Sequence, residues 1–151
     1  MNRAQLTLLA LAIALLNGCG ETDPDMPPEI RLGDSVCIEC GMIVSDERFG
    51  TASIIDDSRG SQALIFDDYN CQKNYELDHT DLKILTRWSR DYETLAWFQT
   101  GEGWLVRSTH IRTPMASNVA GFRAIERAED FASTVNGDVI RYNAYDTTAD
   151  P

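Results

Sequence analysis

The chain has 151 residues, which is enough for one domain or two very small ones with a modest apolar core. Its 24 acidic and 13 basic residues give a formal net charge of −11, and there is no basic stripe or polybasic tail. This balance argues against nucleic-acid-binding proteins and predicts a solvated acidic surface that can attract cations or a basic partner.

The first 18 residues have the pattern of a targeting segment, and they are left out of the predicted fold. Asn2-Arg3 supply the charged start, and Leu6 to Leu16 form an apolar run that is shorter than the about 20 residues needed to span a bilayer. The run ends in Leu16-Asn17-Gly18-Cys19, which resembles the bacterial lipoprotein cleavage box. We therefore expect Cys19 to be acylated and to anchor the protein to a membrane. Gly20, rather than Asp, after the cysteine resembles lipoproteins sorted to the outer membrane.

Residues 19–35 are acidic and rich in proline, with Pro24, Pro27 and Pro28 close together. This composition predicts a disordered, hydrated tether between the lipid and the folded part of the chain. The tail over residues 147–151 is also expected to be disordered. The folded part is therefore predicted over residues 36–146.

Three sulfur donors lie in the short segment Cys37-Ile38-Glu39-Cys40-Gly41-Met42. Thiolate and thioether are soft ligands that suit Cu(I), whereas zinc favours thiolate and imidazole. Gly41 allows the tight turn that would let Cys40 and Met42 face the same point. A CxxC pair alone is shared by redox enzymes and zinc sites, and the methionine that follows favours copper.

The number of cysteines restricts their pairing. With Cys19 assigned to lipid, Cys37, Cys40 and Cys71 remain. In an oxidising compartment an odd number leaves one thiol free, paired between molecules, or bound to a metal. A Cys37–Cys40 disulfide is compatible with the spacing, and so is a Cys37–Cys71 disulfide. The second would contribute roughly 3–4 kcal/mol and leave Cys40 for a metal.

The first half of the folded part predicts three strands and one helix. Strand patterns over residues 49–55 and 62–66 flank a turn rich in Asp, Ser and Gly. Asp67-Asp68 can cap a polar helix over residues 69–77. Residues 82–88 alternate in part between apolar and polar, as a third strand would.

The second half predicts a similar order. Strands over residues 94–98 and 104–109 are expected to form a hairpin around Thr100-Gly101-Glu102-Gly103. Residues 119–122 then lead into a helix over residues 124–135, whose apolar side chains fall on one face.

The end of this helix and the closing strand complete the predicted repeat. Gly137 suits a left-handed helix cap, and residues 138–142 form the last strand. Placing Phe66 opposite Phe122 gives two units of ββαβ type, over residues 36–90 and 91–146. The sequence therefore predicts an α+β fold built from an internal repeat.

No catalytic constellation is present at a recognisable spacing. There is no nucleophile–histidine–acid pattern, no glycine-rich phosphate loop and no HExxH motif. The CxxC of a redox enzyme usually opens a helix after a strand, whereas this one follows a proline-rich segment and precedes Gly-Met. We therefore expect a protein that is not an enzyme. A CxxC thiol–disulfide oxidoreductase and a structural lipoprotein without metal are the alternatives.

Several motifs occur together along the chain. Cys-x-x-Cys-Gly-Met lies behind the lipoprotein signal, Phe66-Asp67-Asp68 follows, and Thr113-Pro114-Met115 leads to Gly121-Phe122. In this combination, over nearly the whole mature chain, the sequence resembles the NosL family. Members of that family are lipoprotein copper chaperones that serve the maturation of nitrous oxide reductase. The family usually continues with Gly after Pro-Met, where this sequence has Ala116.

The resemblance implies a periplasm-facing carrier of Cu(I) that docks on a membrane transporter complex and delivers copper to nitrous oxide reductase. Carried over to this sequence, it implies Cys40 as the thiolate ligand and Met115 as the thioether ligand, with Met42 as a close alternative. Cys37 is a further candidate ligand. His110 is another, because a loop could fold it onto the same ion as Met115.

Overall fold

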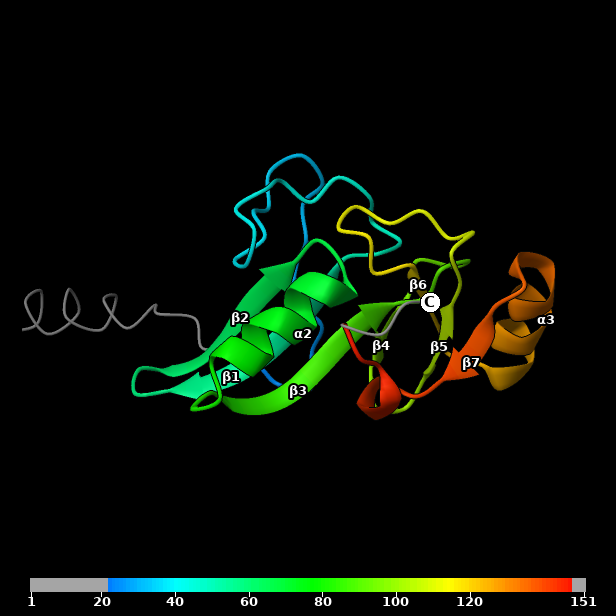
Figure 1. The fold of residues 1–151 in the computed structure, drawn as a ribbon. Coiled ribbons are helices and arrows are strands. Elements are labelled where there is room, and N and C mark those ends of the chain that lie inside the picture. The colour runs from blue at the N-terminus through cyan, green and yellow to red at the C-terminus, as the bar shows by residue number, and fades with distance from the viewer. Residues whose placement is uncertain (1–21, 148–151) are drawn as a thin grey trace, which may run out of the picture.

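Two antiparallel sheets, each with one helix, form the part of the chain that the computed structural model describes, residues 22–147 (Figure 1). The signal segment, Cys19 and the last four residues lie outside the described residues, so targeting and acylation stay predictions. Within residues 22–147, no helix has the length and apolar character required to cross a membrane.

The first unit consists of β1 (Thr51–Asp57), β2 (Gly60–Phe66), α2 (Tyr69–Asp78) and β3 (Lys83–Arg90). β1 lies in the centre of the sheet, with β2 antiparallel on one side and β3 antiparallel on the other. Helix α2 begins where predicted because Asp68 caps it. The predicted order of two strands, a helix and a third strand is confirmed.

The second unit repeats this order with β5 (Trp104–Arg107), β6 (Val119–Phe122), α3 (Ile125–Val135) and β7 (Asp138–Ile140). β5 is again the central strand, between β6 and β7, and a short 3₁₀ helix over Tyr142–Ala144 follows. The predicted α+β fold with two ββαβ units is therefore confirmed.

The hairpin predicted between residues 94–98 and 104–109 is wrong. β4 (Trp97–Gln99) instead pairs with β3 and extends the first sheet, with Trp88 opposite Gln99 and Arg90 opposite Trp97. Side chains on β3 hold β4 in place, because the Arg90 guanidinium stacks 4.1 Å from the centre of the Trp97 ring. Cross-strand packing therefore outweighs the local turn signal.

Residues 22–35, which were expected to form part of the tether, lie against the first unit. The amide of Thr22 donates to the carbonyl of Ser61 at 3.1 Å, and Pro28 is buried. The segment runs along the face of the sheet opposite α2 (Figure 1). That face carries buried Ala52 and Ile54 without a helix to cover it, so burying Pro28 there is favourable.

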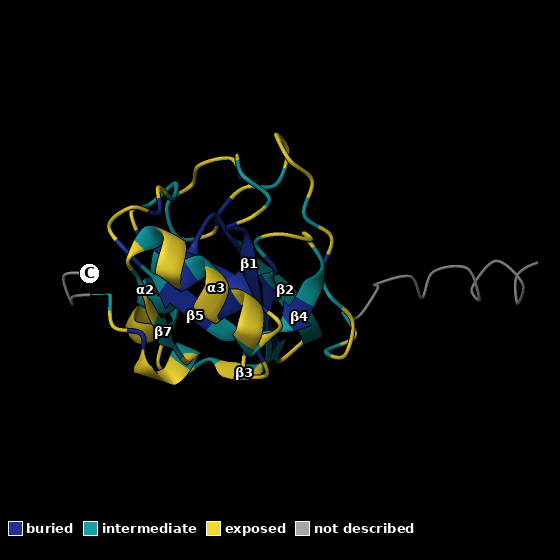
Figure 2. Cartoon of the chain, turned by 90° about the vertical axis from the view of Figure 1, so that its right-hand side faces the viewer, coloured by how far each residue is buried: buried dark blue, intermediate teal, exposed yellow. Residues whose placement is uncertain are grey.

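One hydrophobic core joins the two units. Phe49, which precedes β1, packs with Val106 and Phe122 of the second unit. Tyr69 of α2 packs with Leu105 of β5 in a neighbouring cluster. The buried strands accordingly lie together in the middle of the molecule, with the exposed side of α3 on the outside (Figure 2).

Candidate metal centre

The CxxCGM segment folds into a tight turn above the end of β2. The amide of Cys37 donates to the carbonyl of Met42 at 2.8 Å, and the amide of Gly41 donates to the carbonyl of Cys37 at 2.9 Å. Gly41 has a φ of 72°, in the left-handed region that favours glycine. The amide of Ile38 donates to the carbonyl of Ile65, which attaches the turn to β2. The tight turn predicted at Gly41 is confirmed.

Cys71 brings a third sulfur atom to this turn. It lies in the first turn of α2, and its Sγ and those of Cys37 and Cys40 all lie within 4.8 Å of one another. Cys37 and Cys71 are 0% and 2% exposed, whereas Cys40 is partly exposed. All three are free thiols in this structure, and the pairing of Cys37 with Cys71 stays a prediction.

The surroundings of the sulfur atoms favour ionisation of Cys37 and oppose ionisation of Cys40 and Cys71. Amides of Cys40 and Asp67 donate to the Cys37 sulfur, and the amide of Met42 donates to the Cys40 sulfur. The hydrogen bond between Cys71 and Cys37 lowers the pKa of Cys37, and the same bond raises the pKa of Cys71. Burial raises the pKa of Cys40. The cluster therefore holds one thiolate first, and a bound cation would favour loss of the other protons.

Asp68 connects this cluster to the second unit. Its carboxylate is fully buried, and Oδ1 accepts hydrogen bonds from the amides of Asn70 and Cys71 at the start of α2. Oδ2 accepts three hydrogen bonds, at 3.0 to 3.2 Å, from the loop over residues 113–117: the Thr113 hydroxyl and the amides of Met115 and Ser117. We call this arrangement the Asp68 clasp. It holds the loop of Met115 against the helix end that carries Cys71.

Of the predicted thioether and imidazole ligands, Met115 is the one whose side chain packs against the cluster. It is partly buried and contacts the group formed by Cys37, Phe66 and Cys71. The Met42 side chain is 49% exposed, and the Met42 amide donates to the Cys40 sulfur. His110 is exposed and lines a separate hollow with Phe131.

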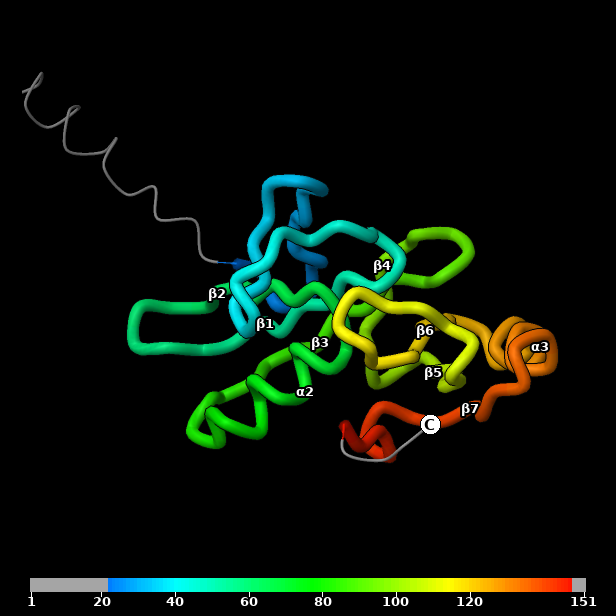
Figure 3. The backbone as a smooth tube through the Cα atoms, turned by 45° about the horizontal axis from the view of Figure 1, so that its top comes forward, coloured from blue at the N-terminus to red at the C-terminus, as the bar shows by residue number. Residues whose placement is uncertain are grey.

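The turn around Cys40 and the loop around Met115 lie side by side at one end of the molecule (Figures 1 and 3). Cys71 was expected only as a disulfide partner, and Asp68 only as a helix cap. The cap is confirmed, but its sequence pattern carries no signal for the hydrogen bonds to residues 113–117. The role of Cys71 depends on the packing of α2 against the turn within the first unit, and that of Asp68 depends on how the two units pack.

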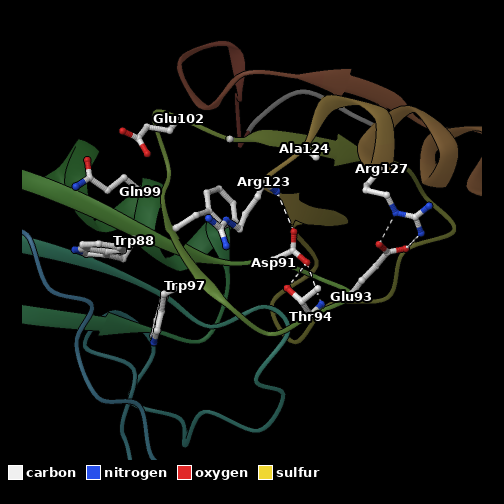
Figure 4. A pocket seen from close by; sticks show the side chains of 12 residues that line it. Trp88, Asp91, Glu93, Thr94, Trp97, Gln99, Glu102, Arg123, Ala124 and Arg127 are labelled. Atoms are coloured by element: carbon white, nitrogen blue, oxygen red, sulfur yellow. Dashed lines mark hydrogen bonds and ion pairs between the residues drawn. The ribbon is translucent and has the colours of Figure 1, made fainter.

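A cavity of about 790 Å³ lies between β4 and the start of α3 (Figure 4). Two of its acidic side chains already have partners. Asp91 accepts hydrogen bonds from the Thr94 hydroxyl and from the amide of Arg123. Glu93 forms an ion pair of 2.6 Å with Arg127. No thiol or imidazole lines this cavity, so the sulfur cluster is the candidate metal centre.

The model of the NosL family matches residues 30–149. The chain belongs to the NosL family. The crystal structure of the copper chaperone NosL from Shewanella denitrificans is similar, with a TM-score of 0.65 and 15% sequence identity. The match covers 81% of this chain and 96% of that chain, and at this identity it shows a shared fold. No curated protein matches the chain significantly.

In this NosL chain, the motifs that carry the resemblance meet in space. Cys-x-x-Cys-Gly-Met forms the turn, Phe66-Asp67-Asp68 leads into α2, and the Asp68 clasp holds the loop of Met115. The amide of Ser45 donates to Asp67 at 3.3 Å, which also ties the chain after the turn to this point. Three segments far apart in the sequence therefore build one sulfur-rich centre.

Proposed function

We propose that this chain is a Cu(I) carrier whose metal centre is formed by Cys37, Cys40, Cys71 and Met115. The observation that carries the proposal is the approach of three Sγ atoms to within 4.8 Å of one another beside a packed thioether. Membership of the NosL family and the likeness to a copper chaperone support copper as the metal.

The donor set favours Cu(I) over other common ions. Thiolates and thioethers are soft donors, whereas Mg²⁺ and Ca²⁺ require oxygen ligands. Asp68 accepts bonds from two chain segments, and Asp67 Oδ1 accepts one from Ser45, whereas Asp67 Oδ2 is buried without a hydrogen-bond partner. Among the described residues, no carboxylate oxygen joins the three Sγ atoms that lie within 4.8 Å of one another. Both histidines lie elsewhere: His79 stacks on Tyr75 outside the thiol group, and His110 is on the second unit. An ion at this centre would therefore have sulfur neighbours.

The difference in exposure among the thiols suggests how the ion leaves. Cys40 is partly exposed, whereas Cys37 and Cys71 are buried. A sulfur ligand of an acceptor can therefore reach an ion bound to Cys40 before the buried thiols let go. Stepwise replacement of ligands allows tight binding and rapid transfer together. Transfer of this kind replaces one copper–sulfur bond by another without a change in oxidation state and leaves both proteins chemically unaltered, so the proposed function is not enzymatic.

The proposed location and partners follow from the sequence and the family. We infer that acylated Cys19 anchors the chain on the periplasmic side of a membrane, the outer membrane being favoured by Gly20. The acceptors are a membrane transporter complex and nitrous oxide reductase, for assembly of the copper centres of that enzyme. One acyl group alone binds a membrane weakly, so stable anchoring requires the several acyl groups of a lipoprotein.

An anaerobic titration with Cu(I) against a competing chelator tests the proposal. The reduced chain without its signal segment, carrying Cys19→Ser, should bind a single Cu(I). Cys40→Ser should weaken binding by about 100-fold, and Met115→Leu by about tenfold, as expected for lost metal ligands. His110→Ala is the matched control and should leave the affinity unchanged. Failure of the parent chain to bind Cu(I), or full affinity in Cys40→Ser, would contradict the proposal. Reduction of insulin by the copper-free chain would favour the oxidoreductase alternative.

A further inference from the structure

Exposed large apolar side chains are concentrated beside the sulfur cluster. Of the nine such side chains among the described residues, six lie between residues 26 and 43. Five of them flank or belong to the CxxCGM turn, and we call them the docking face: Leu32, Val36, Ile38, Met42 and Ile43. Each is about half exposed. Exposed apolar side chains gathered in one segment mark an interaction site more often than scattered single side chains do.

The docking face is held by a folded backbone. Val36 and Ile43 form an antiparallel bridge, and the amide of Val44 donates to the carbonyl of Ser35 at 2.8 Å. Cys37 and Val44 are both fully buried. Because successive residues of an extended segment point to opposite sides, burial of Cys37 and Val44 leaves Val36, Ile38 and Ile43 pointing outward. The same turn therefore buries Cys37, leaves Cys40 partly exposed and presents its apolar side chains to a partner.

The surroundings of the docking face are acidic. Residues 26–48 contain five acidic residues and two basic residues. Ion pairs join Glu29 to Arg31, Asp46 to Arg48 and Glu47 to Arg90. Asp34 and Glu39 form no ion pair with any residue between 22 and 147. A partner that covers the docking face must therefore place positive charge at the edge of the face, where it can compensate the carboxylates of Asp34 and Glu39.

We propose that the docking face receives a protein that exchanges Cu(I) with this chain, through an apolar surface with a basic rim and a sulfur or imidazole ligand opposite Cys40. This inference rests on the proposed function. The acidic surroundings select this occupant over two others. The anionic surface of a membrane would repel the face, and so would a second copy of a chain with a net charge of −11.

Photo-crosslinking in the anchored, full-length chain tests the docking face. A benzophenone side chain is placed at position 38 or 43, or at position 77 or 85 as controls, where Leu77 and Leu85 are also exposed. The face positions should crosslink to one protein with yields at least about tenfold above the controls. The captured peptide should contain Lys or Arg near Cys, Met or His. Capture of lipid, of a second copy of this chain or of an acidic surface would overturn the proposal, as would equal yields at all four positions or no product.

A pair of variants separates docking from copper binding. Ile38→Ser with Ile43→Ser should reduce crosslinking from position 32 by about tenfold, because desolvated apolar anchors carry much of an interface's energy. The affinity of this double variant for Cu(I) should equal that of the parent chain. The control variant, Leu77→Ser with Leu85→Ser, should change neither the crosslinking yield nor the affinity for Cu(I). Unchanged crosslinking in the first variant would contradict the docking face alone. Absence of Cu(I) binding in the parent chain would contradict the proposed function.

Discussion

At the scale of single residues, Cys37, Cys40 and Cys71 show how position differentiates identical side chains. Cys37 receives two backbone amides and the Cys71 thiol, whereas Cys40 receives one amide and is reached by solvent. The sequence predicts Cys40 and Met115 as ligands from their motifs. It cannot place Cys71 among them, because the first turn of α2 meets the CxxCGM turn only after the sheet has formed.

Asp91, which lines the cavity between β4 and α3, provides a prediction about the pH dependence of stability. Its carboxylate is 6% exposed. Burial opposes its ionisation, but the hydrogen bonds from Arg123 and Thr94 prevail, so the pKa of Asp91 is lowered. A lowered pKa means that the folded state binds fewer protons than the unfolded state. Stability from Asp91 is therefore present above the unfolded pKa of about 4 and is lost as the pH falls through the folded pKa.

Asp91→Asn should lower the free energy of unfolding by about 2 kcal/mol near neutral pH, because hydrogen bonds to a buried charge are lost. Urea titrations of the copper-free chain at about pH 7 and about pH 3 measure the effect, and the difference between variant and parent should shrink at the lower pH. Asp130→Asn, at an exposed ion pair, serves as the control and should change little. An equal difference at both pH values would contradict this role for Asp91.

At the scale of elements, the metal centre depends on the contact between the start of α2 and the loop over residues 113–118. Local patterns predict both elements, since Asp68 is a good N-cap and Pro114 is typical of loops. The end of α3 differs from the prediction by one residue. The left-handed backbone conformation expected at Gly137 is at Asn136 instead, with a φ of 49°. Gly137 is instead required because a Cβ there would lie 2.8 Å from the carbonyl oxygen of Arg107.

The Asp68 clasp gives a prediction that links stability to copper binding. Asp68→Ala leaves five donors without their acceptor and should cost about 3 kcal/mol or more, measured by urea unfolding. Asp68→Asn keeps some of these bonds and should cost less. Under the proposed function the clasp affects copper binding through Met115, so the losses of Cu(I) affinity in Asp68→Asn and Met115→Leu should not add in the double variant. Additive losses would show that Asp68 does not act through Met115.

Ala116 offers a stabilising substitution in the same loop. It has a φ of 57°, in the left-handed region that is unfavourable for residues with a side chain. Ala116→Gly should remove this strain and raise the free energy of unfolding by about 0.5–1 kcal/mol, after the greater freedom of glycine in the unfolded chain is counted. Thermal unfolding measures the change. A lower melting temperature would mean that the Ala116 methyl group contributes more than the strain costs.

At the scale of the whole molecule, the repeat explains why the centre contains residues from both halves. The first unit supplies the CxxCGM turn and Cys71, and the second supplies Met115. The ββαβ repeat could be predicted because each unit has its own strand and helix patterns. The pairing of β4 with β3 could not, because it depends on Arg90 and Trp97 meeting across strands.

Gly121 tests the contact between the units. A Cβ there would lie 2.5 Å from the Tyr69 hydroxyl and 2.8 Å from the carbonyl oxygen of Arg90. Gly121→Ala should therefore force the units apart and cost about 1–3 kcal/mol in the free energy of unfolding. Gly101→Ala is the matched control, because a Cβ there meets no atom within 4 Å. Equal stability of the two variants would contradict the tight contact at Gly121.

Under the proposed function, one sulfur-rich centre built by both units holds Cu(I). X-ray absorption at the copper K-edge of the anaerobic complex with one equivalent of Cu(I) tests this, because the method identifies the atoms bound to the metal. The spectrum should show a first shell of sulfur atoms alone, with fewer of them in Cys40→Ser. Nitrogen or oxygen neighbours in the parent complex, or an identical spectrum in Cys40→Ser, would contradict it.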